Sequence, residues 1–257
     1  MWEGLARLLD LTQAGMVAFV LVFTRVGAIA ALLPGFGEQM IPARVRLGIA
    51  IAFALVVWPM LAGLPPPPDR PFFAMMLIEA GIGLMLGIAL RLMVFALQFA
   101  GSIIAQSTAL AQIFGAGVAP DPMPAFGNIL MLAGVTLAVA TGLHVKAAIL
   151  MADSYRILPM GLPVPAEDVA AWGTARVAQS FALGFSLAAP FVIAAFAYNL
   201  ALGAINRAMP QLMVAFIGAP AITAGGILLL MLAAPVILHV WNGRLDAVLA
   251  DPLGTPR

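Results

Sequence analysis

Long apolar runs constrain this chain more than any other feature of its sequence. A helix needs about 20 apolar residues to cross a membrane. Runs near that length lie at Leu11–Leu33, Leu47–Gly63, Asn128–Leu150, roughly Ala178–Leu202 and Leu212–Trp241. A longer run, Phe72–Ala111, is interrupted by Glu79, Arg91 and Gln98, and it fits either one long helix or two. The runs predict an all-α, polytopic integral membrane protein with about six hydrophobic helices, or seven if the long run divides.

Composition excludes several other classes of protein. Hydrophobic residues make up 63% of the 257 residues and charged residues only 9%, whereas soluble domains carry about 25% charged residues. A net charge of +1 provides no basic field for nucleic acid. The chain has no cysteine, and its two histidines, His144 and His239, lie far apart in sequence, so we expect no metal site. HExxH, GxSxG and P-loop motifs are absent from the sequence, so we expect neither an enzyme nor a cofactor.

A polar stretch, Asp153–Arg176, is expected to be a connector and divides the chain in two. We expect an N-terminal part, residues 1–165, with about four spans, and a C-terminal helical hairpin, residues 166–257. Lysine and arginine are scattered among the connectors and do not alternate from one connector to the next. Either the orientation is weakly encoded, or the helices do not form a conventional bundle that faces lipid on all sides.

Three charged residues interrupt the apolar runs. Arg25 either pairs with a carboxylate or with carbonyl groups and fixes packing, or it serves transport or voltage sensing. Glu79 lies twelve positions before Arg91, which is roughly 18 Å along a straight helix, so we expect its partner on another segment or subunit. Gly83 and Gly87 follow Glu79 with the small-xxx-small spacing that lets two helices approach closely.

The connector Ala111–Asn128 is unusually apolar, with Asp121 as its only charge. Non-helical backbone inside a membrane survives only where protein buries it or where it lines a water-filled cavity. The connector is therefore either an enclosed, pore-lining segment or a plain turn at the membrane surface.

Four stretches, in this order along the chain, resemble a known family. They are FTRVGAIAALLPGFGEQMIPARVR, IEAGIGLMLGIALR, QFAGSIIAQSTALAQIFGAGVAPDP and NLALGAINRAMPQLMVAFIGAP, between about Phe23 and Pro220. The sequence is similar to the FliR family of flagellar export-gate proteins and its counterparts in virulence type III secretion. The most specific features are an Arg before P-G-F-G and I-P-x-R, a membrane Glu before a glycine ladder, and R-x-x-P-Q before the last helix.

The resemblance implies a pore subunit of a flagellar type III export gate in the bacterial inner membrane, at the basal body. Its partners would be FliP-like, FliQ-like and FlhB-like subunits, and its substrates unfolded secreted proteins. Residues 1–165 would resemble a FliP subunit and residues 166–257 a FliQ subunit. The main alternative is a stand-alone small-solute transporter or ion channel, which should show facing polar residues in several helices; the sequence has only scattered ones.

The resemblance also implies roles for particular residues. A plug loop at about residues 112–124 would seal the pore through Phe114, Gly115, Gly117, Pro120, Asp121 and Pro122. Buried polar positions that support assembly would be Arg25, Glu79, Arg91, Gln98, Gln106, Arg207, Pro210 and Gln211. The last three belong to the R-x-x-P-Q motif, which would shape the C-terminal hairpin turn.

Overall fold

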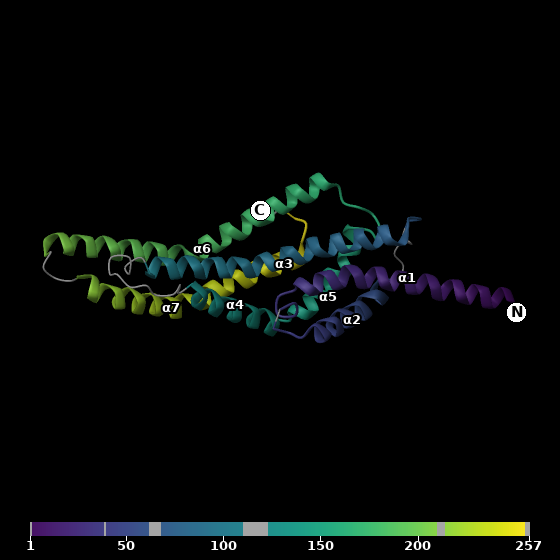
Figure 1. Ribbon diagram of the computed structural model, residues 1–257, viewed down its shortest axis with the longest axis horizontal. Helices are drawn as coiled ribbons and strands as arrows, with labels where there is room; N and C mark the ends of the chain where they lie inside the picture. Colours follow the sequence, from purple (N-terminus) through teal and green to yellow (C-terminus); the bar gives the residue numbers. More distant parts are fainter. Residues whose placement is uncertain (1, 39, 62–67, 110–122, 210–213, 255–257) are drawn as a thin grey trace. The chain divides into compact units, whose positions relative to one another are not determined.

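All regular secondary structure in the described part of the chain is helical. The computed structural model describes residues 2–38, 40–61, 68–109, 123–209 and 214–254. Within these ranges the chain forms seven helices (Figure 1): α1 Trp2–Leu32, α2 Ala43–Met60, α3 Phe72–Ala109, α4 Met123–Ala140, α5 Leu143–Ile157, α6 Ala166–Ala208 and α7 Val214–Ala250. The predicted all-α class is confirmed.

The helices are long and apolar enough for a multi-pass membrane protein. Five of them contain a candidate span: Gly15–Leu32, Ala43–Met60, Phe72–Ser107, Ala166–Ala208 and Ala221–Ala250. A sixth candidate is the broken pair formed by α4 and α5. This number agrees with the expectation of about six hydrophobic helices.

The structure corrects the sequence-based expectation at two places and settles a third. The described part of the long apolar run forms one helix, α3 Phe72–Ala109, which settles the choice between one helix and two. Asn128–Leu150 is broken into α4 and α5 at Gly142, whose φ of +86° is a left-handed conformation that glycine adopts without steric cost. The polar stretch Asp153–Arg176 is mostly helical, because only residues 158–165 separate α5 from α6. Its acidic residues Glu167 and Asp168 lie in the first turn of α6, where they favour a helix start by complementing the helix dipole.

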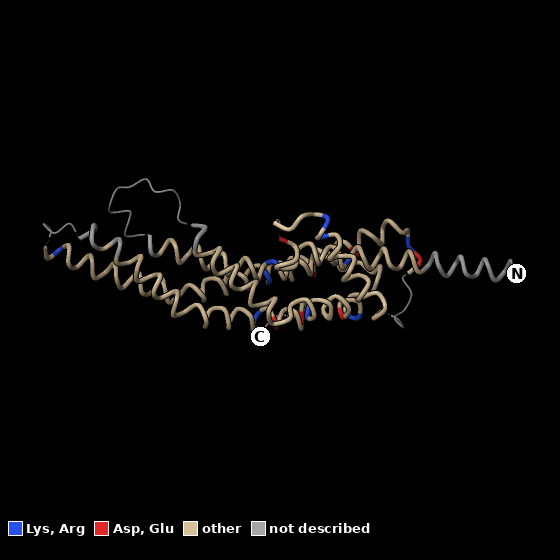
Figure 2. Tube along the Cα trace, turned by 90° about the horizontal axis from the view of Figure 1, so that it is seen from below, with Lys and Arg blue, Asp and Glu red and all other residues tan. Residues whose placement is uncertain are grey.

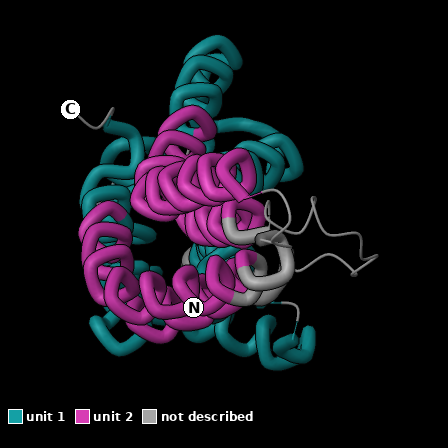
Figure 3. Tube along the Cα trace, turned by 90° about the vertical axis from the view of Figure 1, so that its left-hand side faces the viewer, with its two compact units in different colours: residues 1–91, 139–176, 245–257 teal, residues 92–138, 177–244 magenta. Residues whose placement is uncertain are grey.

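The chain divides into two compact units that alternate along the sequence (Figure 3). Unit 1 contains residues 1–91, 139–176 and 245–257, and unit 2 contains residues 92–138 and 177–244. The sequence of unit 2 holds three charged residues, Asp121, Arg207 and Arg244. The remaining charges belong to unit 1, and the tube of Figure 2 is accordingly tan over long stretches. The expected boundary at residue 165 separates a FliP-like part from a FliQ-like part of the chain. That boundary stays a prediction.

The core of unit 1 forms around α1. Its fully buried side chains include Leu21, Val22, Val26 and Ile29, which recur at helical spacing and make one apolar face. α1 packs against α2, and α2 also packs against α5. An edge-to-face contact between Phe19 and Trp58, with ring centroids 5.6 Å apart, strengthens the α1–α2 packing.

The core of unit 2 forms around the second half of α3. Trp241 on α7 is fully buried, and its indole N–H donates to the carbonyl oxygen of Met93 at 2.7 Å. The Ser180 hydroxyl on α6 donates to the carbonyl oxygen of Leu92 at 2.7 Å. These two bonds join α3 to both C-terminal helices through backbone carbonyls, which are strong acceptors inside an apolar core.

Candidate functional site

The centre of unit 1 contains a fully buried ion pair between α1 and α3. Arg25 Nε lies 2.7 Å from Glu79 Oε2, and Arg25 Nη2 lies 3.1 Å from Glu79 Oε1. Neither side chain has any exposed area. The two parallel bonds match the planar fork of the guanidinium to the carboxylate, which is the strongest geometry for such a pair.

Further polar groups complete the shell around the ion pair. Arg25 Nη1 donates to the carbonyl oxygen of Leu158 at 2.8 Å and contacts the Ser154 hydroxyl at 3.4 Å. Glu79 Oε1 also accepts a bond of 2.8 Å from the backbone N–H of Gly161. A buried charge is tolerated when its remaining hydrogen-bonding sites are filled in this way. The cluster therefore ties α1, α3, the end of α5 and the 158–165 segment together.

Tyr155 closes one face of the cluster. Its ring centroid lies 3.8 Å from the Arg25 guanidinium carbon, a cation–π contact. The residue is 2% exposed, yet its hydroxyl finds no hydrogen-bond partner within the described ranges. The aromatic ring, rather than the hydroxyl group, is what Tyr155 contributes to the cluster.

Two glycines of α3 allow α1 to come close enough for the pair to form. A Cβ atom at Gly83 would overlap the carbonyl oxygen of Arg25 and lie 2.7 Å from Ala28 Cβ. A Cβ atom at Gly87 would lie 2.9 Å from Leu32 Cβ. Glu79, Gly83 and Gly87 recur every four residues on one face of α3. The structure thus places the small-xxx-small motif at the α1–α3 contact, next to the ion pair.

Arg91 does not belong to this buried cluster. Its Nη1 lies 2.6 Å from Glu38 Oε1, and the two side chains are 38% and 25% exposed. In the single chain Arg91 is therefore half-buried and paired with Glu38, and its burial in an assembly stays a prediction. Glu38 was missed because it lies in the polar connector after α1, where the sequence gives no sign of its partner.

Sequence reasoning also missed a second buried arginine, Arg176 in the second half of the polar stretch. It is 4% exposed and donates to the carbonyl oxygens of Asp251, Pro252 and Gly254. The indole N–H of Trp172 donates to the carbonyl oxygen of Pro252 at 3.0 Å. The available signal was the spacing of Trp172 and Arg176, which places them one helical turn apart on α6.

The arrangement at Arg25 suits packing rather than ion movement. Both charges are sealed from solvent, and the donors of Arg25 are aimed at fixed acceptors. Within the described ranges, no three histidine or acidic side chains gather in a way that could hold a metal ion. The geometry fixes helices and the 158–165 segment in place.

Comparison with protein-family models matches residues 16–248 to the family described as bacterial export proteins, family 1. The chain belongs to this family. Among curated proteins, this member of the export family is 37% identical over 230 residues to the flagellar biosynthetic protein FliR of Caulobacter vibrioides, covering 87% of this chain and 91% of the relative. It is 30% identical over 221 residues to FliR of Escherichia coli, covering 83% and 82%. It is also 27% identical over 252 residues to the Yop proteins translocation protein T of Yersinia pestis, covering 95% of each chain.

The remaining positions expected from the family resemblance have mixed placements. The amide nitrogen of Gln98 lies 2.9 Å from the sulfur of Met131, and Gln98 is half-buried. Gln106 and Arg207 are exposed in the single chain. Their burial in an assembly stays a prediction. Several positions lie outside the described residues: the plug residues Phe114, Gly115, Gly117, Pro120, Asp121 and Pro122, and Pro210 and Gln211 of the R-x-x-P-Q motif.

Proposed function

We propose that this export-family protein is a pore subunit of a flagellar type III export gate. It would help to form and seal the channel through which unfolded flagellar proteins cross the bacterial inner membrane. The observation that carries the proposal is the family match over residues 16–248, together with 37% identity to a flagellar FliR protein over most of both chains. The similarity to a Yop translocation protein supports the same type of export apparatus.

The partners proposed are FliP-like, FliQ-like and FlhB-like subunits. Support comes from apolar side chains that the chain leaves uncovered by its own helices. On α6, Ile193, Phe196 and Leu200 are each at least 66% exposed, and on α7, Met231 and Leu232 are at least 70% exposed. Such faces need lipid or neighbouring apolar helices around them.

The role proposed is structural rather than enzymatic. The buried ion pair has a filled hydrogen-bonding shell and leaves no reactive group facing a cavity. The sealing element would be the loop at about residues 112–124, with Phe114 as an apolar stopper. An apolar constriction blocks ions by excluding water, and it can open for a polypeptide without breaking a strong ion pair.

Copurification from native membranes tests the proposal. The intact chain carries an affinity tag, is solubilised in mild detergent, and its bound proteins are identified by mass spectrometry. We expect FliP-like and FliQ-like chains in stable amounts, absent when an unrelated tagged multi-pass protein is treated in the same way. A stand-alone transporter would be recovered without them, and that result would contradict the proposal.

A further inference from the structure

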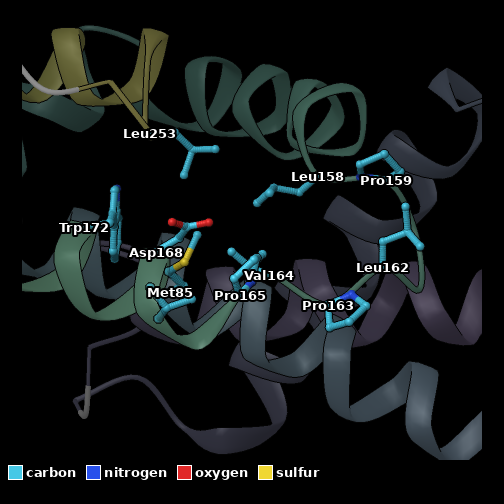
Figure 4. Close-up of a pocket in the computed structure, with 11 residues that line it drawn as sticks. Met85, Leu158, Pro159, Leu162, Pro163, Val164, Pro165, Asp168, Trp172 and Leu253 are labelled. Carbon is cyan, nitrogen blue, oxygen red and sulfur yellow. The ribbon is translucent and has the colours of Figure 1, made fainter.

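Unit 1 contains a cavity of about 400 Å³ beside the segment that joins α5 to α6 (Figure 4). Met85 of α3, the 158–165 segment, the first turns of α6 and Leu253 near the C-terminus line it. Three of the lining residues are prolines: Pro159, Pro163 and Pro165. Proline restricts the backbone, so much of the wall is stiff before anything binds.

The buried ion pair holds one side of the cavity. Arg25 donates to the carbonyl oxygen of Leu158, and Glu79 accepts from the backbone N–H of Gly161. Leu158 and its neighbours Pro159 and Leu162 line the cavity. This wall is therefore anchored to α1 and α3 by charge-assisted hydrogen bonds.

Arg176 and Trp172 hold the opposite side. Arg176 binds three carbonyl groups of the 251–254 segment, and Trp172 binds one of them, at Pro252. This network keeps Leu253 facing the cavity, where the Trp172 ring also lies (Figure 4). Two buried arginines thus set the two walls, and a pocket whose walls are already ordered loses less entropy when it binds.

Among the described residues of the lining, Asp168 is the only charged one, and its carboxylate points into the cavity in Figure 4. Of the four ion pairs found within the described ranges, none includes Asp168 or its neighbour Glu167. Asp168 is exposed to solvent, has no ion-pair partner among the described residues and is bordered by apolar side chains. Such a carboxylate matches a cation carried on an apolar stem. Lysine and arginine side chains have this form.

We propose that this cavity is a docking site for a lysine or arginine side chain on a segment of another protein chain. Asp168 acts as the counter-ion, and the leucines and prolines pack against the alkyl part of the side chain. The site goes beyond the proposed export role, because it assigns a particular contact surface and the charge of its partner.

The lining favours a protein segment over a phospholipid. A phospholipid with an amine headgroup also carries a phosphate, which would need a cation beside it. The described lining residues include no lysine or arginine, and Glu167 adds negative charge close by. The cavity also lies near the lower end of the range for ligand pockets, roughly 300–1,000 Å³, which suits one or two side chains.

Site-specific photocrosslinking in native membranes tests this site. A photoreactive phenylalanine analogue replaces Leu162, a lining residue that is 44% exposed. A parallel sample carries it at Val145, which is 53% exposed on α5 and is not part of the lining. We expect a crosslink from position 162, but not from 145, that maps to one segment of another protein with a lysine or arginine next to the attachment point.

Charge variants decide whether Asp168 recognises that segment. Asp168→Asn should lower the crosslink yield about five-fold, as expected for a partly exposed ion pair, whereas Glu167→Gln should leave it nearly unchanged. Asp168→Lys should abolish the crosslink, and reversing the mapped basic residue to Glu in the same strain should restore it.

Equal crosslink yields for Asp168→Asn and Glu167→Gln would overturn the proposal. So would a product formed only with lipid or with a second copy of this chain, or no product at position 162. Copurification of FliP-like chains is independent of each outcome, so failure of this site and failure of the export role are distinguishable.

Discussion

At the scale of single residues, the ion pair between Arg25 and Glu79 makes each partner dependent on the other. Both side chains are fully buried, and each also bonds backbone groups near the end of α5. Removing one partner leaves the other charged and without compensation in a low-dielectric interior. Replacing both with apolar residues removes the charges together.

Arg25→Met should destabilise the chain by about 3–5 kcal/mol, because Glu79 loses its counter-charge. Thermal unfolding of the purified protein in detergent measures the loss. Arg156→Met is the matched control, since Arg156 forms an exposed pair with Asp153, with side chains 74% and 49% exposed. Its cost should stay below about 1 kcal/mol.

The double variant Arg25→Met with Glu79→Leu should recover most of the stability lost in Arg25→Met. Equal unfolding temperatures for Arg25→Met and Arg156→Met would show that the buried pair does not hold α1 to α3.

Tyr155 makes a separate prediction about its hydroxyl group. Tyr155→Phe keeps the ring over Arg25 and removes a buried hydroxyl without a partner in the described ranges. It should leave the unfolding temperature unchanged or raise it, by up to about 1 kcal/mol in stability. Tyr155→Ala should lower it, because both the cation–π contact and the ring packing are lost. A marked loss in Tyr155→Phe would mean that the hydroxyl is bonded.

At the scale of helices, the contact between α1 and α3 depends on glycine. A methyl group at Gly83 would meet the backbone of α1, which cannot move aside as a flexible side chain can. At Gly81, two positions earlier on the same helix, a methyl group would enter open space, with no neighbouring atom within 4 Å. The two positions therefore separate close packing from the general effect of glycine in a helix.

Gly83→Ala should destabilise the chain by roughly 1–3 kcal/mol through overpacking. Gly81→Ala should stabilise it by about 0.5–1 kcal/mol, because alanine loses less backbone entropy in a helix. Thermal unfolding of both variants in the same detergent compares them. If Gly83→Ala and Gly81→Ala changed the stability in the same direction, that result would contradict the close approach of α1 to α3.

The helices themselves could be predicted from sequence, with informative exceptions. Apolar length identified most spans, since it reflects a requirement of the membrane rather than of tertiary contacts. It did not find the break at Gly142, because both sides of that glycine are apolar and a left-handed turn leaves no mark in hydropathy. Apolar length also assigned the polar residues after Asp153 to a connector, although Glu167 and Asp168 lie in the first turn of a helix.

The site could be predicted only in part. Arg25 and Glu79 were singled out because charges are costly inside apolar runs. Their pairing joins residues 54 positions apart, and the bonds to Leu158 and Gly161 join more distant positions still. Backbone partners of this kind carry no signature in the side-chain sequence. The backbone partners of Arg176 could not be predicted for the same reason, because they include three carbonyl groups.

At the scale of the whole molecule, charge is distributed unevenly between the two units. Unit 2 contains three charged residues in its sequence, and one of them, Asp121, belongs to the proposed plug loop. A unit so poor in charge suits surroundings of lipid and apolar helices. The proposed seal would be part of this unit.

Replacing Phe114 with Ala while shortening residues 115–120 should make the membrane leak ions without preventing assembly, because the apolar constriction would become wet. Conductance of membranes containing the assembled gate measures the leak. Leu132→Ala is the control, an exposed apolar position on α4. Unchanged conductance with intact assembly would remove the plug assignment.

The export role is tested most directly by protein secretion in cells that lack this chain. Flagellar proteins in the culture medium are quantified in the deletion strain, with and without the intact chain supplied from a plasmid. We expect secretion to disappear in the deletion strain and to return with the intact chain, while synthesis of the same proteins inside the cell continues. Normal levels of flagellar proteins in the medium of the deletion strain would contradict the account.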